Sequence, residues 1–430
     1  GPVTINTDLT ITTNGFGGAG TGLTTDGDIF FSDVATIDSQ ASEVNDLVFR
    51  AGAGDLTFNG DIGTASGTSR PGTLTVEDST ATLTFGGADA AAVNSDTAPV
   101  STINLDGALN LGAAATELTS IVFNGGPGVG NTLSVDTTGD DVRINGAVTL
   151  SSSVEITTGA AAGNVTFTND SPIDSEGGES NNLTLTAGTG SVFFNEDLGA
   201  TESLGSLTIT RADGGGGVGG GGVVFGEADT EMAGVGTTGP VNTVSTDDAI
   251  DIGSTNVIAG GIVLNGGAAG IAFQTTDDSV RFNGAVTLQS NASIDTGDAG
   301  GDVTFTSDSP IDSGDGTTAA PLLTRVERND LFVDAGDGSV VFNANIGDTQ
   351  RLDMLTVDRA AGGVIFGGAD TATTGGTGPV TSVATDGAID IGDGTTADDV
   401  INGGIVLNGA ATGIAFQTSS DTVRLNGAVT

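Results

Sequence analysis

The stretch Val142-Arg-Ile-Asn-Gly-Ala-Val-Thr149 decides the fold, because it returns twice with only its third residue changed. The second occurrence is 280–287 and the third is 423–430. The chain also begins with Gly1-Pro-Val-Thr4, which matches the second half of this motif. We call the eight-residue motif the joint. Self-similarity at a near-constant period is the signature of a repeat architecture, so the joints predict tandem copies of one unit.

The joints divide the chain into three copies, which are 1–145, 146–283 and 284–426, with 427–430 beginning a fourth. Linkers between independent domains are typically rich in proline or charge, and none separates these copies. We therefore expect the copies to be fused into one continuous body. Gly1 is expected to begin a processed or excerpted segment, since no initiator methionine or leader sequence precedes it.

Short pairs of apolar residues alternate with polar ones throughout, as in Val165-Thr-Phe167 and Ile271-Ala-Phe273. This period of two is typical of β-strands, and the Gly, Asp, Asn and Thr between the pairs are turn residues. No segment has the 3.6-residue period of an amphipathic helix. The sequence thus predicts an all-β, elongated parallel β-solenoid (β-helix). It leaves open whether each coil holds two strands or three.

The charge is strongly negative, with 55 acidic residues against 10 basic ones and a formal net charge of −45. Such a chain repels nucleic-acid phosphates and anionic lipid, so we expect neither partner. No stretch is apolar for the roughly 20 residues that a membrane-spanning helix needs. The acidity suits a solvated, aggregation-resistant surface, and the alternatives are cation binding and a saline habitat.

Few residue types suited to catalysis are present, because His, Cys, Tyr and Trp are all absent and every basic residue is arginine. Nucleophile–histidine pairs, thiolate chemistry and Schiff-base lysines are thereby excluded. Adjacent acids such as Asp140 and Asp141 remain, but neighbouring side chains on an extended chain point apart, so they are poor glycosidase pairs. We predict no enzyme, no catalytic residue and no organic cofactor.

Calcium is the best chemical candidate, because Asp-rich turns supply the hard oxygen ligands that it prefers. The candidate ligands are Asp26, Asp28, Asp390 and Asp393. The competing interpretation is that Asp-Gly is a turn signal by itself. A further alternative is an ice-binding surface, which would use the Thr-x-Thr segments at 166–168, 184–186, 208–210 and 304–306. The simpler interpretation is that threonine is a favourable residue on exposed strands.

The polar residues of the joint are expected to be structural. Each joint arginine follows an acid by two or three residues, so we expect it to neutralise stacked carboxylates. The asparagines precede glycine at a strand-to-strand corner, where Asn tolerates a left-handed backbone and aligned amides can form a ladder. The joint residues concerned are Arg143, Asn145, Gly146, Arg281, Asn283, Gly284, Arg424, Asn426 and Gly427.

Runs such as Gly-Asn-Val-Thr-Phe-Thr at 163–168 and Gly-Gly-Ile-Val-Leu-Asn-Gly at 260–266 and 403–409 give the chain a family resemblance. It resembles the β-strand repeats of bacterial surface proteins, namely filamentous-haemagglutinin-like adhesins and autotransporter passenger domains. The resemblance covers the whole chain and rests on composition rather than on a specific motif. It implies a right-handed β-helix, export from a Gram-negative cell, and a role in adhesion, biofilm or an extracellular fibre.

We therefore expect a structural, non-catalytic segment of a bacterial extracellular fibre or giant surface adhesin, located outside the cell. Its expected partners are itself, end to end or within a longer chain, and surface glycan or neighbouring fibres. Unpaired strand edges at its ends favour such stacking. The alternatives are a β-helix polysaccharide-processing enzyme and a calcium- or ice-binding solenoid.

Overall fold

A computed structural model describes residues 1–13, 27–64, 69–77, 82–87, 99–112, 117–126, 131–214, 222–226, 239–314, 328–368, 379–392, 401–409, 411 and 413–430. These residues fall into two compact units. Unit one comprises 1–202 and 228–239, and unit two comprises 203–227 and 240–430. The border between the units lies inside the second sequence copy, so the units and the copies do not coincide.

Unit one contains strands alone among its described residues. They are β1 (Val3–Ile5), β2 (Leu9–Thr12), β3 (Ile29–Phe31), β4 (Ile37–Ser39), β5 (Leu47–Arg50), β6 (Leu56–Phe58), β7 (Leu74–Val76), β8 (Thr82–Phe85), β9 (Thr102–Asn104), β10 (Leu109–Leu111), β11 (Leu118–Phe123), β12 (Thr132–Asp136), β13 (Val142–Ile144), β14 (Gly146–Leu150), β15 (Ser153–Thr157), β16 (Val165–Phe167), β17 (Ile173–Ser175), β18 (Leu183–Gly188) and β19 (Val192–Phe194).

Unit two adds one short 3-10 helix, η1 (Gly267–Ala269), to its strands. These are β20 (Leu207–Ala212), β21 (Val223–Phe225), β22 (Thr243–Thr246), β23 (Ile250–Ile252), β24 (Ile262–Leu264), β25 (Ile271–Thr275), β26 (Val280–Phe282), β27 (Val286–Leu288), β28 (Ala292–Asp295), β29 (Val303–Phe305), β30 (Ile311–Ser313), β31 (Leu331–Asp334), β32 (Ser339–Phe342), β33 (Leu355–Val357), β34 (Gly363–Phe366), β35 (Ser382–Ala384), β36 (Ile389–Ile391), β37 (Ile401–Leu407), β38 (Ala415–Gln417), β39 (Val423–Leu425) and β40 (Gly427–Val429).

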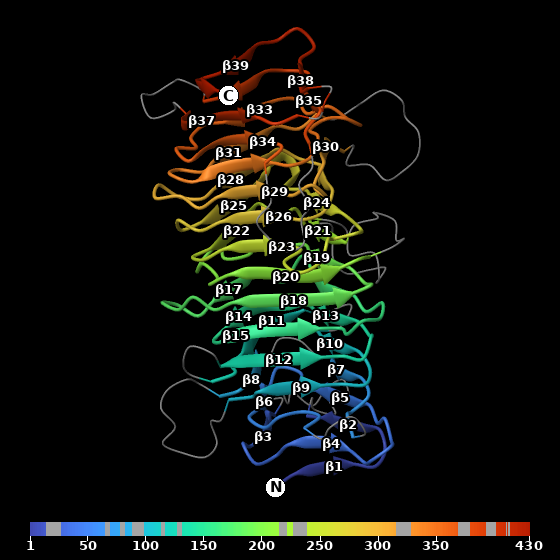
Figure 1. The fold of residues 1–430 in the computed structure, drawn as a ribbon. Coiled ribbons are helices and arrows are strands. Elements are labelled where there is room, and N and C mark those ends of the chain that lie inside the picture. The colour runs from blue at the N-terminus through green and yellow to red at the C-terminus, as the bar shows by residue number, and fades with distance from the viewer. Residues whose placement is uncertain are drawn as a thin grey trace. The chain divides into compact units, whose positions relative to one another are not determined.

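Each unit is a parallel β-solenoid with three faces, which we number in the order in which the chain visits them. In unit one, β9-β12-β15-β18 lie on face 1, β7-β10-β13-β16 on face 2 and β8-β11-β14-β17 on face 3. Figure 1 shows these strands stacked side by side, coil on coil. The chain returns to the same face at every third element, so a coil holds three strands. This confirms the predicted parallel β-solenoid and decides between the two coil types.

Unit two follows the same rule. Face 1 carries β20-β23-β26-β29-β32-β34-β37-β40, and face 3 carries β22-β25-β28-β31-β33-β36-β39. Face 2 carries β21-β24-β27-β30, followed through single bridges at Ile346 by β35-β38. Every strand pairing recorded within either unit is parallel, as the repetition of coils requires.

The interior of each unit is a set of stacked apolar ladders. In unit two Phe282, Phe305, Phe342 and Phe366 stack with ring centroids 5.2–5.4 Å apart. The spacing follows from the parallel register, which sets each inward side chain directly above its equivalent one coil earlier. Most of the described phenylalanines are buried in this way, although Phe30 (54% exposed) and Phe332 (37%) point outward. No helix among the described residues has the length and hydropathy to cross a membrane.

Candidate functional site: the repeated joint

The joint is a strand, a corner and a second strand, as the sequence predicted. The joint at 142–149 supplies β13 and β14 in unit one, and the joint at 280–287 supplies β26 and β27 in unit two. Their apolar residues face the core, since Val142, Ile144, Val280 and Phe282 are completely buried. The corner between the strands is where the polar residues of the motif gather.

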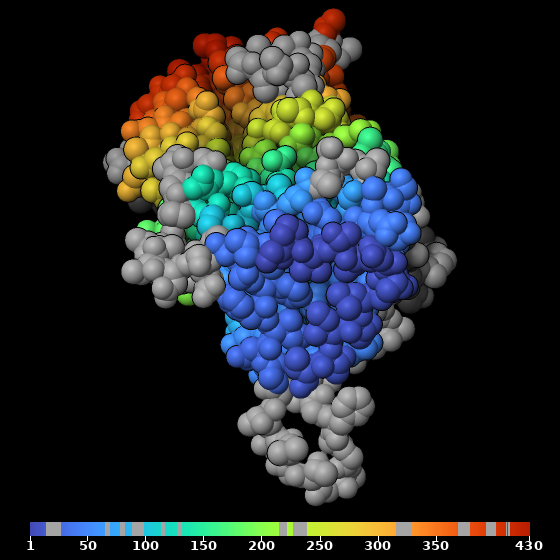
Figure 2. Space-filling view, turned by 90° about the horizontal axis from the view of Figure 1, so that it is seen from below, coloured from blue at the N-terminus to red at the C-terminus, as the bar shows by residue number. Residues whose placement is uncertain are grey.

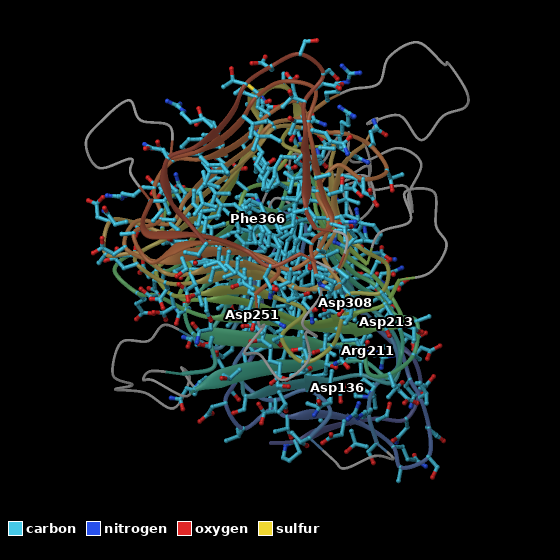
Figure 3. All side chains as sticks on the ribbon, turned by 45° about the horizontal axis from the view of Figure 1, so that its top comes forward. Asp136, Arg211, Asp213, Asp251, Asp308 and Phe366 are labelled. Atoms are coloured by element: carbon cyan, nitrogen blue, oxygen red, sulfur yellow. The ribbon has the colours of Figure 1, made fainter. Side chains whose placement is uncertain are left out.

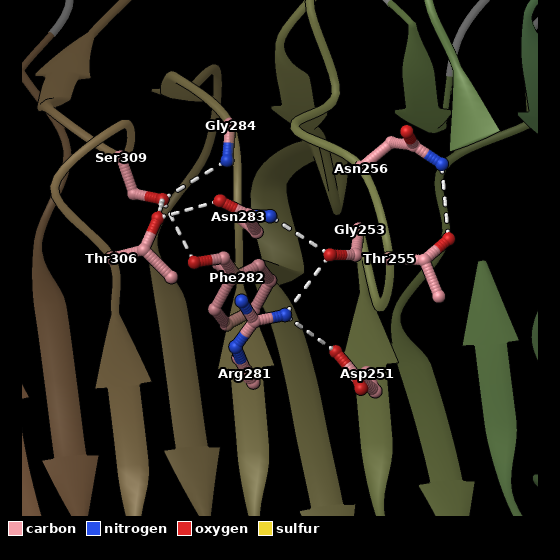
Figure 4. Close-up of polar contacts among 10 residues, drawn as sticks. All are labelled: Asp251, Gly253, Thr255, Asn256, Arg281, Phe282, Asn283, Gly284, Thr306 and Ser309. Atoms are coloured by element: carbon pink, nitrogen blue, oxygen red, sulfur yellow. Dashed lines mark hydrogen bonds and ion pairs between the residues drawn. The ribbon is translucent and has the colours of Figure 1, made fainter. Parts of the chain in front are cut away.

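In unit two the corner is joined to the coil before it through Gly253 (Figure 4). Arg281 donates from Nη1 to the Asp251 carboxylate at 3.0 Å and to the Gly253 carbonyl at 3.0 Å. Asn283, which is completely buried, donates to the same carbonyl at 2.9 Å. Gly253 has a φ of 86°, and a Cβ there would lie 2.7 Å from the Asn283 carbonyl oxygen. Only glycine therefore allows this approach without strain.

The coil that follows binds the other side of the corner (Figure 4). The Thr306 hydroxyl donates to Asn283 Oδ1 at 2.8 Å, and the Ser309 hydroxyl donates to the Phe282 carbonyl at 2.8 Å. The Gly284 amide donates to Ser309 Oγ at 3.0 Å. Buried polar groups need such partners, because an unsatisfied one costs about 1–3 kcal/mol. The corner therefore fixes one coil to the next by polar contacts inside the core.

The same contacts recur at the joint of unit one. Thr168 donates to Asn145 Oδ1 at 2.7 Å, Ser171 donates to the Ile144 carbonyl at 2.8 Å, and the Gly146 amide donates to Ser171 at 3.0 Å. The expected outward position of the Thr-x-Thr threonines is wrong for the second threonine of the segments 166–168 and 304–306. Thr168 and Thr306 are completely buried and belong to this network, which leaves them no contact with water or ice.

Two joint arginines neutralise a carboxylate stacked beside them, as expected. Arg281 pairs with Asp251, and Arg424 donates from Nε to Asp390 at 2.7 Å. Both acids lie directly beside the arginine on the neighbouring coil. The ladder neighbour of Arg143 is Asn110, which carries no charge, and Arg143 donates to the Gly112 carbonyl at 3.2 Å. Cross-coil register, not sequence adjacency, decides the partner.

Successive joints lie on different faces of the solenoid. Within unit two, β26 of the second joint is on face 1 whereas β39 of the third is on face 3. Within unit one, β1 comes from the half-joint at Gly1 and pairs with β4. β4 bridges through Ile62 to Ile103 of β9, so β1 lies on face 1. The corresponding strand of the next joint, β14, lies on face 3. In each unit the motif steps back by one face. One sequence copy is therefore one third of a coil short of a whole number of coils.

The predicted asparagine ladder does not form among the described residues, because the joints lie several coils apart and on different faces. Asn283 and Asn426 turn different corners of unit two, so they cannot lie above one another. Neither takes a left-handed backbone. The non-glycine residues that do so among those described are Ser42, Asp277 and Ser420.

The third joint is the exception, because nothing described covers it. β38, β39 and β40 each end the strand order of their face, and the joint's apolar residues are open to solvent. Val423 is 42% exposed and Val429 is 48% exposed, whereas Val280 is 0% and Val286 is 2% exposed at the corresponding positions of the second joint. The same motif is thus a buried core element once and an open edge once within unit two.

The calcium candidates have other partners or lie outside the described residues. Asp26 and Asp393 are not described. Asp28 accepts the backbone N–H of Asp55 at 3.0 Å, and Asp390 holds Arg424. No group of three potential ligands suited to a metal ion occurs among the described residues. Asp386, in another Asp-rich turn, forms ion pairs with Arg328 and, at 3.7 Å, with Arg351.

Many carboxylates have a structural role that the sequence analysis missed. An aspartate, asparagine or serine directly before a strand accepts the backbone N–H of its equivalent one coil later. Asp8 accepts from Asp46 at 3.0 Å and Asp46 accepts from Thr73 at 2.8 Å. Asp302 likewise accepts from Ser339 at 2.8 Å. The sequence does contain a signal for this role, because a short residue with a side-chain acceptor directly precedes successive apolar pairs.

Among the described residues, carboxyl groups with a raised pKa are Glu117, Glu196 and Asp330. The charge of Asp170, followed by burial, raises the pKa of Glu117, which is on the surface. Burial, followed by the charge of Asp353, raises the pKa of Asp330. Asp330 also accepts the Met354 N–H at 3.0 Å, so its environment is that of the pre-strand acceptors. Other acids form ion pairs with arginine, as Asp213 does with Arg211, and these two residues lie side by side in Figure 3.

Comparisons with known proteins do not add to this geometry, since no family model, no curated protein and no solved structure matches the chain.

Proposed function

We propose that this chain is a structural, non-catalytic β-solenoid segment of a bacterial extracellular fibre or giant surface adhesin, which stacks end to end. The observation that carries the proposal is the parallel register of each unit, in which every coil lies on an equivalent coil. At the first and second joints the second half of the motif meets an Ile-Asp-Ser strand of the next coil in the same register. Exposed strand edges pair readily with further strands, and repeat proteins need a polar cap when they do not.

The composition suits such a role. Backbone ladders and stacked rings give each unit stiffness, and the acidic exterior keeps the assembly soluble and offers cations, glycan or neighbouring fibres an interface. The resemblance to filamentous-haemagglutinin-like adhesins and autotransporter passenger domains supports an extracellular, bacterial setting. The second candidate function is that of a polysaccharide-processing enzyme, and the fold alone supports it.

Sedimentation velocity over a range of chain concentrations, followed by electron microscopy, tests the proposal. We expect species larger than the 41.7 kDa chain, growing with concentration and with added salt, because salt screens the repulsion between acidic chains. A monomer at every concentration and salt level contradicts self-stacking. Turnover of a polysaccharide from a glycan panel supports the enzymatic alternative instead.

A further inference from the structure

A second motif recurs once in each copy, and the proposed function does not use it. It reads Phe-Asn, any residue, Asp or Asn, Ile or Leu, and Gly, and it lies at 58–63, 194–199 and 342–347. In the third copy its asparagine, Asn343, directly follows β32 at a corner of unit two. The Asn343 side chain is 1% exposed, and neither its Oδ1 nor its Nδ2 has a hydrogen-bond partner among the described residues. Buried amides normally have partners, so this one needs a physical explanation.

Asn343 lies in a column of corner residues to which each coil contributes one. Parallel register places Thr306 on the coil before it and Gly367 on the coil after it, with Asn283 and Asn408 next on the two sides. Thr306 donates to Asn283 Oδ1 at 2.8 Å, and Asn408 donates to the Gly367 carbonyl at 2.7 Å. The hydrogen bonds of this column are therefore interrupted at Asn343.

The coil before the amide has one acceptor left to offer. A hydroxyl has one hydrogen to donate and two lone pairs with which to accept. The Thr306 hydroxyl donates to Asn283 and accepts the Asp308 N–H at 3.3 Å, so one lone pair remains. The Ser309 hydroxyl lies 3.1 Å from it, but its hydrogen is donated to the Phe282 carbonyl.

The coil after the amide has no side chain to offer. Gly367 holds that place, its N–H donates to the Phe342 carbonyl at 2.7 Å, and its own carbonyl accepts from Asn408. Its φ of 81° lies in the region that favours glycine, and a Cβ there would clash with the Asn408 carbonyl oxygen. No larger residue can therefore reach the amide from this position.

We propose that Asn343 holds a buried water molecule, which completes the column. The water accepts from Asn343 Nδ2 and donates to the remaining lone pair of Thr306 Oγ, so it joins two coils as the direct contact of Thr306 with Asn283 does. Buried waters typically bind polar groups that would otherwise be unsatisfied, and ordering one costs less than leaving both atoms of an amide without partners. A metal ion fits less well, because Nδ2 is a donor and no group of three potential metal ligands occurs among the described residues.

The same position of the second copy, in unit one, shows the same feature independently. Asn195 is 1% exposed and donates from Nδ2 to the Phe167 carbonyl at 3.0 Å, whereas its Oδ1 has no partner among the described residues. The coil before it again carries a threonine, Thr168, whose hydroxyl donates to Asn145. Figure 2 shows no open channel through the described residues of unit one drawn in blue, so bulk solvent does not enter from that side. A buried water at this corner donates to Asn195 Oδ1.

Replacing the amide by an apolar side chain of similar size distinguishes a hydrated amide from an unsatisfied one. If Asn343 holds water, Asn343→Leu loses its hydrogen bonds, and the folding equilibrium constant from urea titration should fall about fivefold or more for each bond lost. If the amide is unsatisfied, the same change removes a buried polar group and should raise the midpoint. The matched control, Asn283→Leu, breaks hydrogen bonds that the structure shows and should lower the midpoint in either case.

Because leucine can also lower the midpoint by crowding its neighbours, a second measurement detects the water in the unaltered chain. We expect nuclear Overhauser effects between water and the side-chain amide protons of Asn343, which are assigned by their loss in Asn343→Leu. The control is Asn124, a buried amide with backbone partners on both sides: it donates to the Gly87 carbonyl at 2.6 Å and accepts the Gly126 N–H at 2.9 Å. It should show no such effect.

Water contacts at Asn343 but not at Asn124, together with a lower midpoint for Asn343→Leu, support the buried water. Their absence at Asn343, or a midpoint that is unchanged or higher in Asn343→Leu, overturns it. Neither result bears on self-stacking, because the site lies inside one chain.

Discussion

Asp251 and Arg281 lie opposite one another on adjacent strands of face 1 in unit two, with their charged atoms 3.0 Å apart, although 30 residues separate them in the chain. The corresponding positions of the third joint, Asp390 and Arg424, form the same pair. The first joint has Asn110 at the position of the acid. The coil register therefore places an acid beside the joint arginine in two joints and an amide beside it in the first.

An acid in place of Asn110 should stabilise the protein. Asn110→Asp sets a carboxylate beside Arg143, which is 5% exposed, and charge-assisted hydrogen bonds of this kind contribute about 1–2 kcal/mol. We expect a higher midpoint of thermal unfolding, measured by circular dichroism. The matched control is Asp251→Asn, which converts the second joint to the pattern of the first and should lower the midpoint. A destabilising Asn110→Asp would show that Arg143 tolerates no charge beside it.

The serine of the buried corner should matter more than its less buried neighbour. Ser309→Ala leaves the Gly284 amide and the Phe282 carbonyl without this hydroxyl, at an expected cost of about 2 kcal/mol in the free energy of unfolding. Ser307→Ala, at a half-buried position where the hydroxyl donates to Asp308 at 3.5 Å, should change it by less than about 0.5 kcal/mol. Urea titration measures both. Equal effects would mean that the corner network contributes nothing specific.

Breaking the aromatic stack should destabilise unit two. Phe305 lies between Phe282 and Phe342, 5.2 and 5.4 Å away, and Phe305→Ala removes both contacts and leaves a cavity costing about 4 kcal/mol. Hydrogen exchange should show the loss of protection to be greatest in β26, β29 and β32. Phe332→Ala, at an outward position, is the control and should cost less than about 1 kcal/mol. Uniform loss over the chain would contradict local stacking.

Asp330 should make stability depend on pH. Its pKa is raised in the folded state by burial and by Asp353, so the folded protein holds the proton more tightly than the unfolded chain. Stability from this group is greatest at low pH and falls as pH rises from the ordinary aspartate value through the raised one. Asp353→Asn removes the repelling charge, so we expect a smaller slope above the ordinary aspartate pKa and greater stability near neutrality.

The measurement is chemical unfolding at several pH values, with the Asp330 carboxyl followed by NMR. Asp348→Asn, which removes an exposed charge, is the control for the general effect of net charge. An unchanged slope in Asp353→Asn would mean that burial alone sets the pKa of Asp330.

Added salt should stabilise the chain whatever the cation. With a formal net charge of −45, screening reduces repulsion between carboxylates. Because Asp28 and Asp390 already have a backbone N–H and an arginine as partners, we expect calcium and sodium at matched ionic strength to raise the unfolding midpoint equally. A rise specific to calcium would support an ordered calcium site.

The sequence alone determined the fold class, because alternation of apolar and polar residues is a local property, and repetition of the joint predicts stacking of like on like. Only the tertiary structure decided that a coil holds three strands and that successive joints step from face to face. That step depends on how many residues each turn consumes, and turn length leaves the alternating pattern unchanged.

The partners of the joint were decided in the same way. Arg281 meets Asp251 and Asn283 meets Thr306 because parallel register brings residues 23 to 30 positions apart to one place. The sequence predicted that joint arginines neutralise stacked carboxylates, and Arg281 and Arg424 do so. The expected asparagine ladder does not form among the described residues. In a solenoid the neighbour that counts energetically is one coil away, and the length of the coil is fixed by the fold as a whole.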